Sequence, residues 1–279
     1  LVPKSAGIQD LVFLTSLFLA FGGLEVSAVH AGEVKNPQKS FPRAIAIAAW
    51  IALVLYVVGA LSIAIMIPKE QISVISGLME AFHLFFTNMG ISWLIIPVGL
   101  MIILGAVGEL NAWIIGPIRA MHATTKHGDL PPFFQKLNRH GMPAHLLLFQ
   151  AIVVTLVSFV FLFMPSASSA FWILSAMSVQ LYLLMYIVMF LAAIKLRYSH
   201  PHIKRTYKIP FRMHGIWWIA SIGTISSVFA FFIGFIPPAQ LDVGSLWFYE
   251  GFLIFGIFIM CLVPYLIYHF RKPSWKPKK

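Results

Sequence analysis

The sequence predicts an all-α integral membrane protein with seven transmembrane helices, the first of which is discontinuous. Charged residues make up only 10% of the 279 residues and hydrophobic residues make up 59%, whereas a soluble domain carries roughly 25% charged residues. The apolar residues form long runs, and a helix needs about 20 such residues to cross the hydrocarbon core. A membrane-spanning barrel strand instead needs about 10 residues in an alternating pattern. The expected spans are 8–31, 44–67, 91–122, 144–164, 170–196, 215–236 and 247–270.

The first span, 8–31, combines a pair of glycines with an acid at membrane depth. Gly22 and Gly23 each disfavour a helix by about 1 kcal/mol relative to alanine, and a carboxylate such as that of Glu25 costs about 3 kcal/mol near the bilayer centre. Together they predict a broken helix whose unwound backbone offers N–H and C=O groups to a ligand. The alternative, close helix packing through small residues, assigns no role to Glu25.

A segment that is less apolar than the spans lies between the second and third spans. Span 44–67 contains no charged residue and stops at Pro68. Over 70–89, apolar residues alternate with serine, glutamate, histidine and asparagine, which predicts an amphipathic helix on the outer surface of the membrane. Span 91–122 then returns to the inner side and ends just beyond Arg119.

The last four spans are separated by segments that interrupt helices. A loop with glycine and two prolines at 127–132 follows the third span, and a short turn at 165–169 separates the fourth span from the fifth. A double proline separates the last two spans, and a basic tail, 271–279, follows them. Because no segment has the composition of a soluble domain, we treat the chain as a single membrane domain, 1–279.

The formal net charge of +11 would suit a nucleic-acid ligand, but the distribution of the charge indicates a membrane protein. All of the 20 basic residues except Lys4 and Lys69 lie in alternate loops and in the C-terminal tail. This is the positive-inside pattern, so we expect a cytoplasmic C-terminus, contact with the lipid bilayer and no nucleic-acid partner. The first residue, Leu1, then lies outside, and without a signal-peptide pattern we expect that a further segment precedes it. The oligomeric state stays open.

Two acids and two tyrosines inside the predicted spans are candidates for function. Glu25 and Glu109 both lie at membrane depth, where an ionisable residue indicates a functional site. Trp113 follows Glu109 by four residues and shares its helix face. Tyr182 and Tyr186 have the same spacing and are too central in their span for an interfacial aromatic belt, so we expect them to line a cavity.

The histidine and cysteine residues predict no metal site and no catalytic centre. His30, near the inner end of the first span, is a candidate for pH sensing, because the ordinary pKa of histidine is about 6.5. No histidine pair has metal-ligand spacing beside a cysteine or an acid, and the single cysteine, Cys261, excludes a disulfide within the chain. No phosphate-binding, nucleophile-elbow or dinucleotide motif is present. We therefore predict no cofactor and no enzymatic activity.

Six motifs spread over nearly the whole chain are typical of one group of transporters. They are FGGLEVSAVH at 21–30, EVKNP at 33–37, GELNAWIIGPIR at 108–119, YLLMY at 182–186, HPHIKRTYKIP at 200–210 and VPYLIY at 263–268. These motifs resemble the amino acid–polyamine–organocation superfamily, and within it bacterial glutamate/GABA antiporters. The resemblance implies that the seven spans correspond to helices six to twelve, the second half of a twelve-helix inverted-repeat (LeuT-like) transporter fold.

The resemblance also implies where substrate binds and what is transported. Substrate contacts are expected at Gly22, Gly23, Leu24, Glu25, Glu109, Trp113, Tyr182 and Tyr186. Unwound backbone would hold the α-amino and carboxylate groups, the acids would set charge preference or take up protons, and the aromatic rings would pack against the substrate. The implied activity is exchange of glutamate for GABA by alternating access in the bacterial inner membrane.

Two other functions stay open. One is a proton-coupled amino acid symporter, in which Glu25 and Glu109 would serve equally well as proton carriers. The other belongs to a different class, a membrane sensor or partner subunit that uses the same fold without transporting. Such a protein would not need a polar cavity, so the acids and tyrosines inside the spans argue against it.

Overall fold

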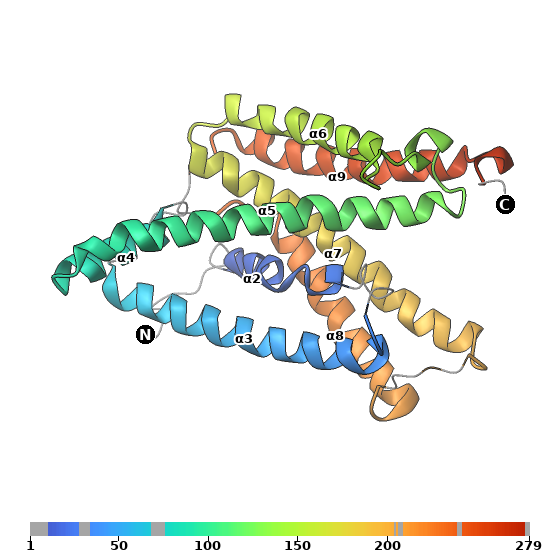
Figure 1. Cartoon of the computed structure of the whole chain (residues 1–279), viewed down its shortest axis with the longest axis horizontal. Helices are drawn as coiled ribbons and strands as arrows, with labels where there is room; N and C mark the ends of the chain where they lie inside the picture. Colours follow the sequence, from blue (N-terminus) through green and yellow to red (C-terminus); the bar gives the residue numbers. More distant parts are fainter. Residues whose placement is uncertain are drawn as a thin grey trace. The chain divides into compact units, whose positions relative to one another are not determined.

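The structure is a computed structural model, which describes residues 11–27, 34–67, 76–203, 205, 209–238 and 242–276. The described residues form helices and loops, and none of them lies in a β-strand (Figure 1). The α-helices are α2 (Phe13–Phe21), α3 (Pro37–Met66), α4 (Gly77–Asn88), α5 (Ile95–Thr125), α6 (Ala144–Ser158), α7 (Ala167–Ser199), α8 (Arg212–Ile233) and α9 (Leu246–His269). Short 3₁₀ turns are η3 (Ser92–Leu94), η4 (Pro132–Gln135), η5 (Phe159–Leu162) and η6 (Pro273–Trp275).

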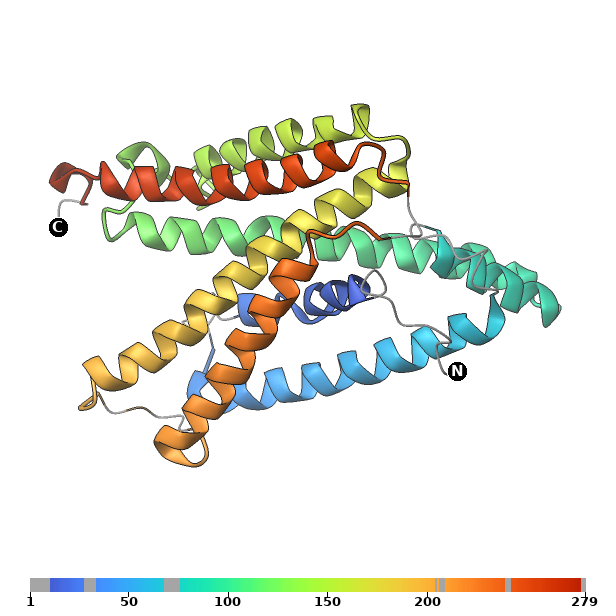
Figure 2. The same ribbon diagram turned by 180° about the vertical axis from the view of Figure 1, so that it is seen from behind.

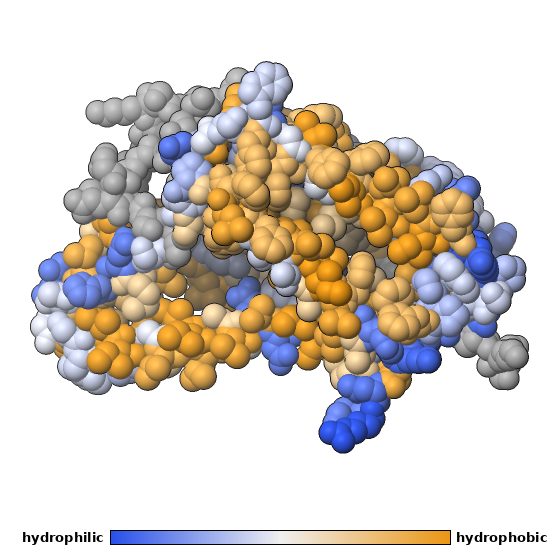
Figure 3. All heavy atoms as spheres, turned by 90° about the horizontal axis from the view of Figure 1, so that it is seen from above, coloured by the Kyte–Doolittle hydropathy of each residue, from blue (hydrophilic) through white to orange (hydrophobic). Residues whose placement is uncertain are grey.

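Six of the described helical segments are long and apolar enough to cross a membrane, and a shorter apolar one precedes them. The six are Pro37–Met66, Ser92–Thr125, Ala144–Leu162, Ala167–Ser199, Met213–Ile233 and Leu246–His269, and the shorter segment is Thr15–Ser27. The predicted fold class, an all-α membrane protein, is therefore confirmed. Figure 3 shows hydrophobic residues over much of the visible surface, as expected where lipid replaces water as the solvent.

The chain divides into two compact units, which are described separately. The first unit comprises 1–25, 34–42 and 154–270, and α7 is its central helix, against which α2, α8 and α9 pack. Figures 1 and 2 both show α8 running alongside α7. Because lipid is as apolar as a helix surface, such helices associate through close van der Waals packing.

The core of the first unit lies where α7 meets its neighbours. Ile173 of α7 and Leu253 of α9 are fully buried in it. At the start of α2, Phe13 packs edge-on against Trp172 of α7, with ring centroids 5.3 Å apart. Farther along, the buried Leu183 of α7 lies in a second cluster against which Phe18 and Leu19 of α2 pack. Thus α2 follows α7 in the same direction, and its C-terminal end comes to the middle of α7.

The predicted break in the first helix is present. Helix α2 ends at Phe21, and Gly22 is extended, with φ −65° and ψ 147°. Gly23 has a φ of 95°, a region that glycine enters readily and other residues avoid. The chain then makes a 3₁₀ turn over 24–27. The glycine pair therefore changes the direction of the backbone within two residues.

The second unit comprises 26–33, 43–153 and 271–279, and its longest helix wholly inside the unit is α5. Helix α4 packs against α5 through a turn at η3 and lies within the segment 70–89 predicted to be amphipathic; its place on the outer surface stays a prediction. At the other end of α5, Arg271 forms an ion pair of 2.8 Å with Asp129. Gln135 donates to the carbonyl oxygen of Trp275 at 2.6 Å, so the tail after α9 is held against the loop that follows α5.

Candidate substrate-binding site

The broken end of α2 holds the carboxylate of Glu25 in a fixed position. The backbone N–H of Gly23 donates to Oε2 of Glu25 at 3.2 Å. The hydroxyl of Tyr186, on α7, donates to the same oxygen at 3.1 Å. A Cβ atom on Gly22 would lie 3.6 Å from that hydroxyl, so the unwound backbone itself lies close to Tyr186. The carboxylate is therefore positioned jointly by the glycine pair and by α7.

The second oxygen of this carboxylate is a buried acceptor. Oε1 of Glu25 is buried and has no hydrogen-bond partner among the described residues. A buried acceptor without a partner costs about 1–3 kcal/mol, and more when it is charged. An ammonium or hydroxyl group of a ligand would remove this cost by donating to Oε1. The arrangement thus suits a cationic or hydrogen-bond-donating group.

Tyrosines of α7 form one wall beside Glu25. Tyr182 and Tyr186 lie one helical turn apart, with ring centroids 5.9 Å from each other. Both side chains are half-buried, so each ring has one part packed against the protein and another part exposed. Of the residues predicted to bind substrate, the structure places Gly22, Gly23 and Glu25 with these two tyrosines, and Leu24 lies in the same 3₁₀ turn as Glu25.

The structure does not place three of the predicted functional residues, Glu109, Trp113 and His30, at this site. Glu109 and Trp113 lie on α5, in the second unit. Glu109 is exposed, and Trp113 is partly buried. Their part in a common site with Glu25 stays a prediction. His30 lies outside the described residues.

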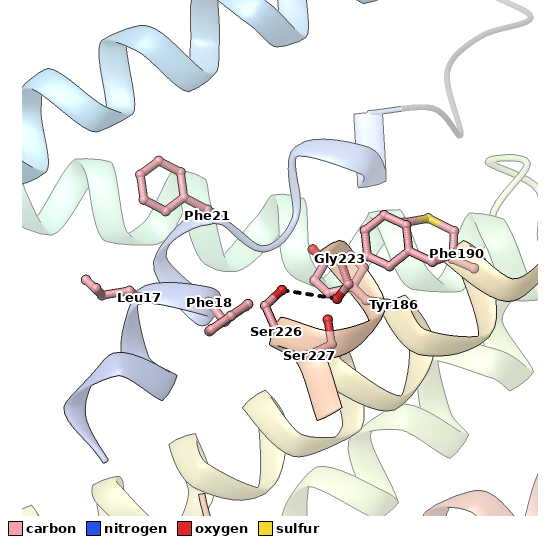
Figure 4. Close-up of a pocket in the computed structure, with 9 residues that line it drawn as sticks. Leu17, Phe18, Phe21, Tyr186, Phe190, Gly223, Ser226 and Ser227 are labelled. Atoms are coloured by element: carbon pink, nitrogen blue, oxygen red, sulfur yellow. Dashed lines mark hydrogen bonds between the residues drawn. The ribbon is translucent and has the colours of Figure 1, made fainter. Parts of the chain in front are cut away.

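Sequence reasoning missed a cavity of about 410 Å³ between α2, α7 and α8. Its lining residues are Leu17, Phe18 and Phe21 from α2, Tyr186, Met189 and Phe190 from α7, and Gly223, Ser226 and Ser227 from α8 (Figure 4). A paired serine in an apolar helix is a weak signal that could have drawn attention to α8. The contact of α8 with α2 was not detectable, because the two helices are about 200 residues apart in sequence.

Comparison with known protein families identifies this chain. Residues 3–259 match the family described as amino acid permease. The chain belongs to this family. Amino acid permeases are multi-pass membrane transporters, so the prediction that the protein is not an enzyme is confirmed. Among the described residues, no group of three or more histidine, cysteine, aspartate or glutamate side chains could hold a metal ion.

Individual permeases with similar sequences include transporters of several substrates. An uncharacterized transporter of Legionella pneumophila is 38% identical over 265 residues, which are 95% of this chain and 57% of the relative. A glutamate/gamma-aminobutyrate antiporter of Lactococcus lactis is 33% identical over 270 residues, 96% of this chain and 54% of the relative. A probable agmatine/putrescine antiporter of the same species is 28% identical over 207 residues, 74% of this chain and 44% of the relative.

The predicted likeness to glutamate/GABA antiporters is therefore confirmed. The chain spans about half the length of the curated relatives that it matches.

Proposed function

We propose that the full-length permease is an antiporter that exchanges extracellular glutamate for intracellular GABA by alternating access. The observation that carries the proposal is the carboxylate of Glu25, held by Gly23 and Tyr186 with its other oxygen free. Both glutamate and GABA carry an ammonium group, which would donate to Oε1. The carboxylate group of either substrate would lie beside the unwound backbone at Gly22 and Gly23.

Exchange is favoured over symport by the relatives. Two of the similar proteins, from Lactococcus lactis, are named as antiporters for glutamate/gamma-aminobutyrate and agmatine/putrescine. In both named pairs at least one exchanged partner is an amine, which fits a site with a carboxylate at its centre. A proton-coupled symporter is the second candidate, because a carboxylate at membrane depth could also carry a proton.

The remaining parts of the proposal concern residues and orientation. We propose that Glu109, Trp113 and His30 contribute to substrate binding or proton sensing, as the family motifs imply. Tyr182 would pack its ring against the bound substrate. The positive-inside pattern supports a cytoplasmic C-terminus in a bacterial inner membrane. A non-transporting sensor is disfavoured, since a sensor does not require a carboxylate at a helix break with one oxygen hydrogen-bonded and the other without a partner.

The test is counterflow in proteoliposomes that contain the purified full-length protein. Labelled glutamate uptake is followed at pH 5.5 and pH 7.5, with and without GABA inside the vesicles. Uptake that depends on internal GABA is the expected result and would establish exchange. Uptake indifferent to internal GABA but driven by an imposed proton gradient would replace exchange with symport, and absence of any amino acid uptake would overturn the proposed function.

A further inference from the structure

In the second unit, the segment after α9 and the loop between α5 and α6 are fixed to each other. The carboxylate of Asp129 forms an ion pair of 2.8 Å with Arg271, and Gln135 donates to the carbonyl oxygen of Trp275 at 2.6 Å. These contacts join residues 142 and 140 positions apart. Residues from two distant parts of the sequence therefore share one surface. We call the two segments the loop–tail surface, 126–143 and 271–276.

A glycine in the loop allows the tail to approach closely. Gly128 is buried and has a φ of 81°. A Cβ atom on it would lie 2.7 Å from Cγ and 3.2 Å from Cα of Lys276, closer than a side chain and a neighbouring backbone normally come. Because Gly128 has no side chain, the backbone of Lys276 can lie against the loop. The loop therefore sets the position of this lysine.

The loop is itself ordered by local contacts. The side-chain oxygen of Asn138 accepts from the backbone N–H groups of His140 and Met142, each at 2.9 Å. Earlier in the loop, Phe134 packs edge-on against Phe149 of α6, with ring centroids 5.8 Å apart. The surface to which the tail is attached is therefore a defined turn that is anchored on a helix.

The loop–tail surface has a large excess of positive charge. It carries six lysine and arginine residues and one acid, Asp129, which is already paired with Arg271. Its lysines are exposed and form no ion pair with any residue that the structure describes; they are Lys126, Lys136, Lys272 and Lys276. Exposed positive charge that no acid balances attracts anions.

Exposed apolar side chains lie among these charges. Phe133 is 54% exposed and Leu137 is 51% exposed, and Lys136 lies between them in the sequence. The loop connects two helical segments that are long and apolar enough to cross a membrane, Ser92–Thr125 and Ala144–Leu162. A surface that combines lysines with exposed aromatic and aliphatic side chains beside such helices is typical of contact with an anionic bilayer.

We propose that the loop–tail surface binds anionic phospholipids of the adjacent membrane leaflet. Lysines of the loop and of the tail donate to the lipid phosphate, while Phe133 and Leu137 lie at the boundary between headgroups and acyl chains. The ion pair of Asp129 with Arg271 prevents the one acid of this surface from repelling the phosphate. The inference does not depend on the proposed exchange activity, because lipid binding is measured without transport.

The experiment uses the purified, delipidated full-length protein in detergent. Phosphatidylglycerol and phosphatidylcholine with the same acyl chains are titrated separately, with native mass spectrometry as the measure of bound lipid and the unfolding temperature as the measure of stabilisation. We expect phosphatidylglycerol to bind at the lower concentration and to raise the unfolding temperature more. Equal binding of the two lipids would overturn the inference. Inorganic phosphate is the third arm, and equal stabilisation by phosphate would exclude a lipid as the specific occupant.

A double variant tests the lysines. Each lysine near an anionic surface contributes about 1 kcal/mol, so Lys136→Gln with Lys276→Gln should weaken phosphatidylglycerol binding by up to about 30-fold. The matched control is Lys35→Gln with Lys39→Gln, since these lysines are also exposed but belong to another loop, in the first unit. The control should weaken binding by about threefold or less, because separated exposed charges are screened. Equal losses would mean that net charge alone attracts the lipid, which contradicts a defined site.

A substitution that leaves the charge unchanged tests the arrangement of the two segments. Gly128→Ala displaces Lys276 from the loop, so we expect phosphatidylglycerol binding to weaken by about fivefold, the contribution of one lysine. Gly141→Ala is the matched control, because Gly141 also has a positive φ, 72°, but a Cβ there would meet no atom within 4 Å. It should bind lipid as the wild type does. Unchanged binding in both variants would show that the position of the tail is irrelevant and would refute the shared site; if Gly128→Ala fails to fold, the lysine variants still decide.

Discussion

Glu25 and Glu109 are the same residue type and both lie inside predicted membrane spans, yet their surroundings differ. Glu25 follows a glycine pair that ends α2, is partly buried, and accepts hydrogen bonds from the backbone of Gly23 and from Tyr186. Glu109 lies on the continuous helix α5, is exposed, and receives no hydrogen bond from any described residue. The difference is that the carboxylate of Glu25 is held by a break in its own helix and by a donor on a neighbouring helix, whereas no described residue holds the carboxylate of Glu109.

The largest expected effect is that of removing the charge of Glu25. Glu25→Gln keeps the size of the side chain but gives an amide, which binds an ammonium group much less strongly. Hydrogen bonds to charged groups contribute about 1.5–3 kcal/mol, so we expect exchange to fall by about 100-fold. Initial rates in proteoliposomes would measure this, with protein amount and unfolding temperature as controls, and a rate within twofold of wild type would contradict the assignment.

The helix break is tested by substituting alanine for a glycine near Glu25 and, separately, for a glycine near Glu109. Gly23→Ala forces a side chain into the positive-φ region, at about 1–2 kcal/mol, and should lower the unfolding temperature by a few degrees and slow exchange. Gly108→Ala on α5 is the matched control, because a Cβ there would meet no atom within 4 Å. It should be neutral or slightly stabilising, because alanine is the better helix former. Equal effects of the two substitutions on stability would show that the break is not built into the fold.

Removing one hydroxyl tests the contribution of α7 to the site. Tyr186→Phe deletes the donor to Glu25 but keeps the ring that lines the cavity. A single hydrogen bond contributes about 1 kcal/mol net, so we expect about a fivefold loss of exchange rate. Tyr265→Phe, on the exposed face of α9, should leave exchange unchanged. If both variants behave alike, Tyr186 does not position Glu25 in the working transporter.

The smallest effect is expected for Glu109→Gln. Because no described residue holds this carboxylate, its replacement should change the rate by about threefold or less at any one pH, on the scale of a weak exposed interaction. Its effect should instead be visible in the shape of the rate profile between pH 4 and pH 8, if Glu109 takes up protons or sets charge preference. A profile that coincides with wild type over this range would remove Glu109 from the site.

The fold class and the position of the break were predictable from the sequence because both depend on local properties. The length of each apolar run decides whether a helix can cross the hydrocarbon core, and two adjacent glycines weaken a helix wherever they occur. The spacing of Tyr182 and Tyr186 likewise puts them on one helix face, since residues four apart lie about one turn from each other in a helix of 3.6 residues per turn.

Which helices meet could not be predicted and is visible only in the folded chain. The hydrogen bond from Tyr186 to Glu25 joins residues 161 positions apart, and the contact of Gly223 with Phe190 joins two different helices. In a water-soluble protein the apolar stripe of a helix indicates which side faces the core, but membrane helices are apolar on nearly all sides. Pairing therefore depends on the detailed fit of side chains and small residues. For this reason the helices and the unwound glycines follow from local sequence, whereas the donor to Glu25 and the apolar cavity beside it result from the packing of distant helices.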